Sequence, residues 1–379
     1  MNKKVPHRPP SPALRPGTPA TPLARAAQLF RQGDAAEAAR LCQEIVEKEP
    51  TNAQAWQLLG MARIVGEQFQ PAIEPLERAL ALDGRNAQTL CLLGTACSRL
   101  GQGDEAIAWF DRALALDMRQ AAVWYDRGNV LHTLGRHEQA LQSLDRALML
   151  APTFANAWLN RGQVLAHLKQ PKEAMASFRK ATETDPRSAK AWLALGNALS
   201  QARRLPDALT CYEKAVALDD QNAEAWIRCG RTLLDLGGLE DALKHFDKAE
   251  ALEPTAVSLW SGRAMALHRL GNRMAEAVEA LQKAHELAPR SASITVELMH
   301  SLQNVASWQP LPPILEAVQK SIREGQPASP FAVLAHPDLT ADDLLKASTS
   351  APSPLDDEER PVRLDAPATP LGQIGRAHV

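Results

Sequence analysis

Apolar residues recur along the chain at a fixed interval, the one that separates Trp124 from Trp158. The interval is clearest in one series of large side chains, which comprises Trp56, Leu90, Trp124, Trp158, Trp192, Trp226 and Trp260. Glycines from Gly60 to Gly230 keep the same phase, and so do two series of alanines that begin at Ala72 and Ala79. A further series places large residues between the alanines: Leu76, Phe110, Leu144, Phe178, Tyr212 and Phe246. Self-similarity at such a period indicates a repeat architecture in which each period is one supersecondary unit.

Within each period the apolar positions lie three or four residues apart, which is the spacing of one face of an α-helix. Each unit has the form of two helices, WxxxGxxLxxLG and xxEAxxxFxxALxLxP, and a proline or an aspartate ends the second. A glycine inside a helix costs about 1 kcal/mol relative to alanine. The glycine series therefore indicates that the two helices of a unit approach closely there, while the tryptophans and phenylalanines fill the wider space.

These residues resemble the tetratricopeptide repeat, whose pattern is W-x2-L-G-x2-Y, then A-x3-F, then A and P. The match covers residues 53–256 as six regular units. A seventh unit, 257–291, has one inserted residue near Arg273, and a divergent unit at about 19–52 lacks the tryptophan. The resemblance implies an all-α fold, a right-handed superhelical solenoid of antiparallel helix pairs with a concave groove.

The chain departs from the family pattern at two kinds of position. Arg127, Arg161 and Arg263 stand where the family has leucine, and Pro75 falls inside the second helix of its unit. Proline removes a backbone donor from a helix. We therefore expect Pro75 to kink that helix or to delay its start.

We expect four segments along the chain. Residues 1–18 form a disordered tail rich in proline and arginine, and residues 19–291 form the array of about eight units, the first divergent. Residues 292–350 form a helical cap and connector, and residues 351–379 form a disordered linker. The last six residues, Ile374–Val379, match the translation of ATCGGAAGAGCACACGTC, which looks like a sequencing adapter, so we expect the end to be artefactual and the reading frame truncated.

The segment after the array resembles the connector of bacterial SPINDLY-like O-linked N-acetylglucosamine transferases, which joins their repeats to their catalytic region. The residues that match are Leu298, Trp308, Gly325, Ser329-Pro330-Phe331, Leu334-Ala335, Pro337-Asp338 and Leu345. Those enzymes continue into two nucleotide-sugar-binding domains, which would need roughly 300–400 more residues. The resemblance implies that the chain is the substrate-recognition fragment of such a glycosyltransferase, without its catalytic domains.

Motifs that carry catalytic chemistry are missing from the sequence. There is no phosphate loop, no G-x-G-x-x-G, no H-E-x-x-H and no G-x-S-x-G. We expect no cofactor, no metal and no catalytic residue in this chain. Only the resemblance of the connector therefore indicates that the chain could belong to an enzyme. His132 and His167 could lie on the groove wall, but a lone histidine on a helix more often faces solvent.

Charge and cysteine content narrow the partners and the compartment. A net charge of −2 gives no overall attraction to nucleic acid or to an anionic membrane. No window approaches 18 uninterrupted apolar residues, so we expect no membrane span. The five cysteines form no CxxC pair and are odd in number, which favours a reducing compartment. We therefore expect a cytoplasmic protein.

In the tetratricopeptide family, the groove is lined by first-helix residues at the second, fifth, sixth, ninth, twelfth and thirteenth places of each unit. The resemblance implies a peptide-binding set of Tyr125, Asn129, Asn156, Asn160, Lys190, Asn197, Arg228 and Arg231. Gln54, Gln88, Asp126, His132 and Glu224 fall on the same face. An amide offers a donor and an acceptor, so it can hold an extended backbone whatever its side chains. The four members from Lys190 onward could instead gather into a carboxylate-binding patch.

These features predict a protein–protein interaction scaffold that binds extended polypeptide segments in the groove. Its partners would be other proteins or peptides, with no nucleic acid and no membrane. The glycosyltransferase fragment is one alternative, and a clamp for acidic C-termini is another. The identity of the partner and the oligomeric state are open.

Overall fold

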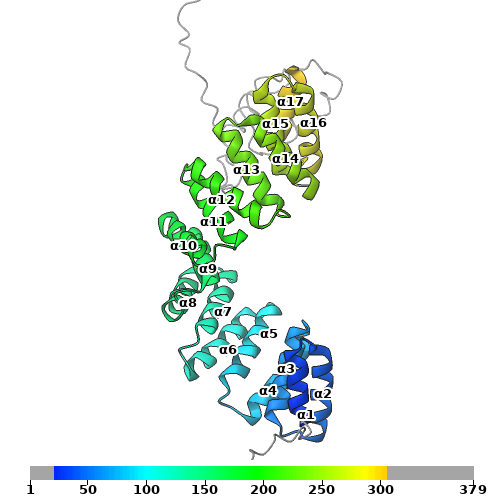
Figure 1. Ribbon diagram of the computed structural model, residues 1–379, viewed down its shortest axis with the longest axis vertical. Coiled ribbons are helices and arrows are strands. Elements are labelled where there is room, and N and C mark those ends of the chain that lie inside the picture. The colour runs from blue at the N-terminus through cyan, green and yellow to red at the C-terminus, as the bar shows by residue number, and fades with distance from the viewer. Residues whose placement is uncertain (1–20, 305–379) are drawn as a thin grey trace, which may run out of the picture. The chain divides into compact units, whose positions relative to one another are not determined.

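The computed structural model of the protein describes residues 21–304, and every regular element in that range is an α-helix (Figure 1). The helices are α1 (Pro22–Arg31), α2 (Ala35–Lys48), α3 (Ala53–Val65), α4 (Phe69–Leu82), α5 (Ala87–Arg99), α6 (Gly103–Leu116), α7 (Ala121–Thr133), α8 (His137–Leu150), α9 (Ala155–His167), α10 (Pro171–Thr184), α11 (Ala189–Gln201), α12 (Leu205–Leu218), α13 (Ala223–Leu236), α14 (Leu239–Leu252), α15 (Val257–Leu270), α16 (Met274–Leu287) and α17 (Ala292–Asn304). Odd-numbered helices up to α15 are the first members of the predicted pairs, and even-numbered helices are the second members. The predicted all-α array of helix pairs is confirmed.

The described residues divide at Ala198 into two compact units, residues 21–198 and residues 199–304. In the first unit each helix from α1 to α10 packs against the next, and the first helices α3, α5, α7 and α9 also touch in succession. In the second unit the same order of contacts runs from α12 to α17, and α13 touches α15. The main contacts are therefore between neighbours along the chain, as expected of repeats that cannot bury their apolar faces alone.

In α3, α5, α7, α9 and α13 the glycine of the first helix lies against the large apolar residue of the second helix of its own pair. A Cβ atom added at Gly162 would lie 2.5 Å from Cδ1 of Phe178, and one added at Gly94 would lie 2.5 Å from Cε1 of Phe110. The same contact recurs at Gly60, Gly128 and Gly230. Real Cβ atoms do not approach other atoms so closely, so this place admits only a hydrogen. The close approach expected from the glycine series is confirmed.

The tryptophans tie each first helix to the turn before it. The indole Nε1 of Trp158 donates to the backbone carbonyl of Pro152 at 2.9 Å, and that of Trp124 donates to the carbonyl of Met118 at 3.0 Å. The bond recurs with the same sequence separation at Trp56, Trp192, Trp226 and Trp260. Most of these indoles are half-buried, whereas Phe110, Tyr212 and Phe246 are almost completely buried. The series of large second-helix residues therefore fills the core, whereas the tryptophans, most of them half-buried, also donate a hydrogen bond.

The turn inside each pair contains one residue in the left-handed region. These residues again follow the period of the repeat, at Gly33, Glu67, Gly101, Gly135, Lys169, Arg203, Gly237 and Gly271. Helix α14 begins two residues after Gly237, whereas α16 begins three residues after Gly271. The residue inserted near Arg273 therefore lengthens this turn by one and leaves both helices intact.

Two of the three arginines that replace leucine, Arg127 and Arg161, each connect three helices. Arg127 on α7 donates from Nε to Asp111 Oδ1 on α6 at 2.7 Å, and from a terminal nitrogen to Ser143 Oγ on α8 at 2.7 Å. The same arrangement recurs one repeat later in Arg161, Asp145 and Ser177. Ser143 and Ser177 are buried, so each guanidinium satisfies a hydroxyl that lies away from water. Consecutive repeats are therefore linked here by hydrogen bonds where the family pattern uses leucine.

Pro75 lies inside α4 without delaying its start. The helix has 14 residues, like α6 and α8. Pro75 cannot donate to the carbonyl of Pro71, and this carbonyl instead accepts from a terminal nitrogen of Arg63 on α3 at 2.7 Å. Arg63 also donates to Gln43 Oε1 at 3.2 Å. The helix start is therefore not delayed, and the preceding helix supplies the donor that proline lacks. The kink, which was the other expectation, stays a prediction.

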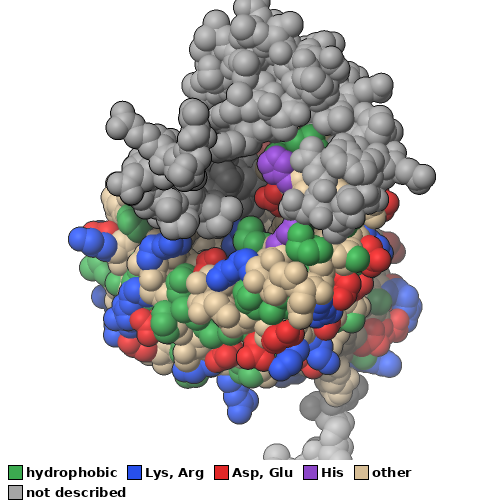
Figure 2. All heavy atoms as spheres, turned by 90° about the horizontal axis from the view of Figure 1, so that it is seen from above, with side chains coloured by type: hydrophobic (Ala, Val, Ile, Leu, Met, Phe, Trp, Pro, Cys, Tyr) green, Lys and Arg blue, Asp and Glu red, His purple; other side chains and the backbone are tan. Residues whose placement is uncertain are grey.

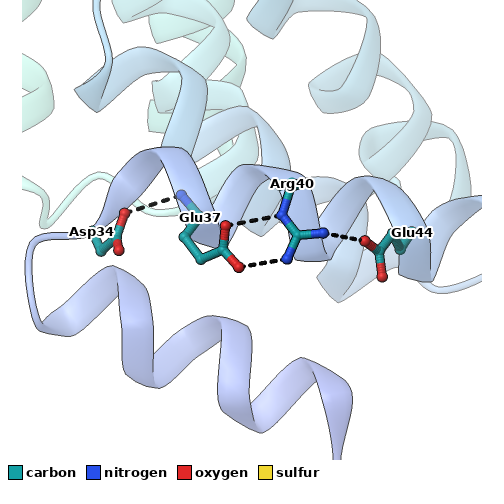
Figure 3. A network of polar contacts seen from close by, with 4 residues as sticks. All are labelled: Asp34, Glu37, Arg40 and Glu44. Atoms are coloured by element: carbon teal, nitrogen blue, oxygen red, sulfur yellow. Dashed lines mark hydrogen bonds and ion pairs between the residues drawn. The ribbon is translucent and has the colours of Figure 1, made fainter.

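Local polar contacts run along the second helix of the divergent first pair (Figure 3). Asp34 Oδ1 accepts from the backbone N–H of Glu37 at 3.1 Å and caps the start of α2. Arg40 donates to both carboxylate oxygens of Glu37, at 2.9 Å and 2.5 Å, and to Glu44 at 2.6 Å. The hydrogen bond from Arg40 holds the pKa of Glu37 below its ordinary value. These contacts lie at the surface, so they guide the helix locally and add little to its stability.

Helix α17 packs on α16 and covers the last pair with Ile294, Leu298 and Leu302, which are all buried. The other residues that match the transferase connector, from Trp308 to Leu345, lie outside the described residues. The same is true of the predicted tail and of the predicted linker with its adapter-like end. The division of the chain into four segments stays a prediction.

Replacing Gly162 by alanine should destabilise the array by about 1–3 kcal/mol, because the added methyl group overlaps Phe178. Urea unfolding measures the loss, and hydrogen exchange should rise mainly around α9 and α10. Gly84→Ala is the matched control, since an added Cβ there lies 3.8 Å from its nearest neighbour. Equal stability of the two variants would contradict the packing role of the glycine.

A double-mutant cycle should show that Arg63 and Pro75 are coupled. Arg63→Met leaves the Pro71 carbonyl without its donor and should cost about 0.5–1.5 kcal/mol. In a Pro75→Ala background residue 75 has an N–H for that carbonyl, so the same change should cost at least about 0.5 kcal/mol less. Gln43→Ala, which removes the other partner of Arg63, should show no coupling to Pro75. Purely additive free energies of unfolding for Arg63 and Pro75 would refute the interpretation.

Candidate functional site: the first-helix face of the first unit

Three residues of the predicted groove set meet on adjacent first helices. Asn160 on α9 donates from Nδ2 to Asn129 Oδ1 at 2.6 Å and to Tyr125 Oη at 3.2 Å, and both acceptors are on α7. All three side chains are half-buried. The ring of Tyr125 also packs on Phe154, just before α9, with 4.6 Å between the ring centroids. This trio of Tyr125, Asn129 and Asn160, the polar trio, is therefore a fixed contact between two repeats.

The bonds inside the polar trio leave a defined set of donors and acceptors. Both protons of the Asn160 amide are engaged, whereas Asn160 Oδ1 has no partner among the described residues. The amide nitrogen of Asn129 and the hydroxyl proton of Tyr125 are likewise unengaged within that range. A peptide unit needs one donor for its carbonyl and one acceptor for its N–H. Asn129 offers the donor and Asn160 offers the acceptor, so the two asparagines together could bind one peptide unit. Neither of them offers both groups alone.

A second contact between amides joins α3 and α5 in the same way. Gln57 Nε2 donates to Gln88 Oε1 at 3.3 Å and to Asn86 Oδ1 at 3.4 Å. Gln57 and Gln88 are 31 residues apart, and so are Asn129 and Asn160. Sequence reasoning placed Gln88 on this face but missed Gln57. The recurring separation of the two amide pairs was the signal that would have found it.

The predicted residues outside the polar trio lie on the first helices α9, α11 and α13. They are Asn156, Lys190 and Asn197 in the first unit and Arg228 and Arg231 in the second. Arg228 donates from Nε to Glu224 Oε1 at 2.6 Å, one turn earlier on α13. The carboxylate-binding patch stays a prediction, and one of its expected cations already has an acidic neighbour.

Asp126 lies beside the polar trio on α7 and is half-buried. It has no hydrogen bond and no ion pair within the described part of the chain. Burial raises the pKa of its carboxyl to about 6. Burial, and then the nearby Asp126 charge, raise the pKa of the Cys91 thiol on α5 to about 11. Cys91 donates its S–H to Gln120 Oε1 at 3.7 Å, so it offers Asp126 no hydrogen bond. The sequence placed Asp126 on the face, but its uncompensated burial depends on packing and could not be predicted.

His132, His137 and His167 form a cluster of imidazoles from α7, α8 and α9. Their ring centroids are 4.9–5.2 Å apart, and Nδ1 of His132 lies 3.2 Å from Nδ1 of His137. Burial, and then the two neighbouring imidazoles, lower the pKa of His132. The expectation of lone, solvent-facing histidines is wrong for His132, which is half-buried among its neighbours, whereas the side chain of His167 is exposed. No group of three potential ligands among the described residues is arranged to hold a metal ion.

Charges of both signs mix on the surface. Figure 2 shows Lys and Arg side chains interspersed with Asp and Glu on the described part of the face that it displays. The net charge of the chain is −2. With so small a net charge, the selection of a partner would depend on local groups instead of a long-range field.

Comparison with protein families finds the tetratricopeptide repeat along the described chain. One family model with this description matches residues 23–87, 125–189 and 228–292, which is about half of the chain. Two further tetratricopeptide-repeat models match residues 85–153 and 189–222. No curated protein sequence matches the chain.

Solved structures of repeat proteins resemble the chain in fold. A Pseudomonas aeruginosa protein, PilF, is 23% identical with a TM-score of 0.50, over 55% of this chain and 94% of PilF. A chain of the APC/C hetero-tetramer Cut9–Hcn1 is 15% identical with a TM-score of 0.51, over 74% of this chain and 55% of that one. YrrB, described as a TPR protein with an unusual peptide-binding site, is 25% identical with a TM-score of 0.46, over 51% of this chain and 97% of YrrB. At these identities, PilF and the Cut9–Hcn1 chain support the fold alone.

Replacing Asp126 by asparagine should stabilise the protein at neutral pH by about 2 kcal/mol, a figure that allows for screening by water at a half-buried group. A carboxyl whose pKa rises from 3.8 in the unfolded chain to about 6 in the folded one binds its proton more tightly when folded. Its unfavourable contribution is therefore absent below about pH 4 and complete above about pH 6. Urea unfolding at pH 4.5 and pH 7.5 should show the gain mainly at the higher pH. A gain that is equal at both pH values, or a loss at pH 7.5, would contradict the assigned burial.

Proposed function

The chain belongs to the tetratricopeptide-repeat family, and from this premise we propose that it is a protein-interaction scaffold that binds extended polypeptide segments. The binding surface would be the first-helix face of the first unit, and the polar trio would be its centre. Further binding residues of this face would be Asn156, Lys190 and Asn197, as the family pattern implies. On the second unit, taken by itself, the family pattern implies Arg228 and Arg231.

The proposal depends on the hydrogen-bond donors and acceptors of the polar trio that have no partner within the described chain. Asn160 offers an acceptor, and Asn129 and Tyr125 offer donors, on helices that touch. A backbone in the extended form exposes its own donors and acceptors, whereas a helix uses them internally. An extended segment therefore matches this face better than a folded helix does, and the match does not depend on the side chains of the segment.

We propose other proteins or peptides as the partners. We do not propose nucleic acid, because a net charge of −2 gives no overall attraction to its phosphates. None of the helices in the described range is long and apolar enough to cross a membrane. The five cysteines form no disulfide, which supports a reducing compartment, and we propose the cytoplasm. The oligomeric state is left open.

The glycosyltransferase fragment rests on the connector resemblance, most of which lies outside the described residues. The family models and solved structures that match the chain describe repeat proteins. We therefore base the proposed function on the repeat array and not on a transferase.

Alanine substitutions in the polar trio should weaken peptide binding without unfolding the chain. Dodecapeptides selected from a random phage-displayed library on the full chain serve as probes, and fluorescence anisotropy measures their dissociation constants. Asn129→Ala or Asn160→Ala alone should weaken binding by at most about tenfold, because one hydrogen bond contributes about 0.5–1.5 kcal/mol. The double variant should lose less than the sum of the two, since the residues bond each other.

Gln142→Ala is the control, because Gln142 is an exposed amide on the second helix α8. It should bind the probes like the wild type. A charge-driven clamp predicts a different pattern, in which Lys190→Ala abolishes binding and added salt weakens it steeply. If the double asparagine variant binds normally while Lys190→Ala does not, the proposed binding surface is wrong.

A further inference from the structure

Asp126 has a charge that nothing in the described chain compensates. It is half-buried, its neighbour Cys91 is a neutral thiol, and no cation or donor contacts it. A partly desolvated carboxylate without a partner weakens the folded state. Asparagine at this place would avoid the cost, as the next repeat shows with Asn160. A destabilising carboxylate on a binding face is expected where it serves a ligand.

The surroundings of Asp126 are apolar on one side and polar on the other. Leu92, Asp126 and Asn160 occupy the same place in successive repeats, on α5, α7 and α9, and these helices touch in succession. Leu92 is partly buried and packs against the core. Asn160 belongs to the polar trio that would hold the backbone of a bound segment. Along this face, an apolar residue on α5 is therefore followed by a carboxylate without a partner on α7 and by Asn160 on α9, which would bind the backbone of the segment.

We propose that Asp126 binds the cationic side chain of a lysine or arginine in the partner, so that the first-helix face selects extended segments that carry a basic residue. This inference deepens the proposed function and rests on it. The aliphatic stem of the basic residue would lie along Leu92, and its ammonium or guanidinium group would reach Asp126. The cation supplies the counter-charge and the donors that the carboxylate lacks.

Charge complementarity decides between classes of partner. An acidic segment would place like charges together in a partly desolvated site, which is unfavourable. A neutral polar segment could satisfy the polar trio but would leave Asp126 uncompensated. A basic segment satisfies both, and its binding offsets the cost that Asp126 imposes on the free protein.

The test uses the full chain and the same random dodecapeptide library, selected in parallel on the wild type, on Asp126→Asn and on Glu138→Gln. Glu138 is exposed on α8, so its variant removes the same charge away from the face. A selected peptide is then resynthesised with its basic residue replaced by norleucine or citrulline, which keep the stem and remove the charge.

The wild type and Glu138→Gln should enrich one lysine or arginine at a fixed position. The basic peptide should bind them about 10- to 100-fold more tightly than its neutral counterpart, as expected for hydrogen bonds to a charged group. Asp126→Asn should bind both peptides alike while staying folded.

Three results would overturn the inference. If the selected peptides carry no basic residue but lose affinity with Asn129→Ala, the proposed function stands and the role of Asp126 is wrong. If Glu138→Gln lowers the preference as much as Asp126→Asn does, the attraction is a general surface effect. If no peptide binds the wild type, the proposed function and the inference both fail.

Discussion

The contact between a first-helix glycine and the large residue of the second helix sets the spacing within the pairs that contain it. The distance of 2.5 Å from a Cβ placed at Gly162 to Cδ1 of Phe178 shows that only a hydrogen fits there. At this spacing the first helices of successive repeats in the first unit also touch, which brings Asn129 and Asn160 within 2.6 Å of each other. The polar trio and its unengaged donors thus depend on a packing constraint that lies behind the face on which they appear.

Polar side chains complete this apolar framework where the repeat pattern is imperfect. Arg127 bonds a buried serine and links α6, α7 and α8, and Arg63 supplies the donor that Pro75 removes from α4. These contacts offset local departures from the pattern, so they stabilise the fold. Asp126 is different, because no group in the described chain offsets its burial. The side chains of Arg127 and Arg63 have hydrogen-bond partners within the fold, whereas the carboxylate of Asp126 has none in the described chain. This difference is the physical reason to assign Asp126 to binding instead of to folding.

The period of the sequence predicted the fold because a fixed interval between equivalent residues imposes the same helix pair each time. It placed Asn129 and Asn160 on one face, but their hydrogen bond needed the positions of both helices. It missed the donation from Arg63 to Pro71 and the meeting of His132 with His137, since long side chains reach between helices in ways that spacing does not determine. The half-buried state of Asp126 was likewise a product of packing.

Photo-crosslinking of a bound peptide tests the central claim most directly. A peptide selected on the full chain carries a benzophenone side chain, and the crosslinked residues are identified by proteolysis and mass spectrometry. The account predicts adducts on the first helices α7 and α9, close to Tyr125 and Asn160, and their loss in the double Asn129→Ala, Asn160→Ala variant. Adducts concentrated on the second helices α8 and α10, unchanged in that variant, would contradict it.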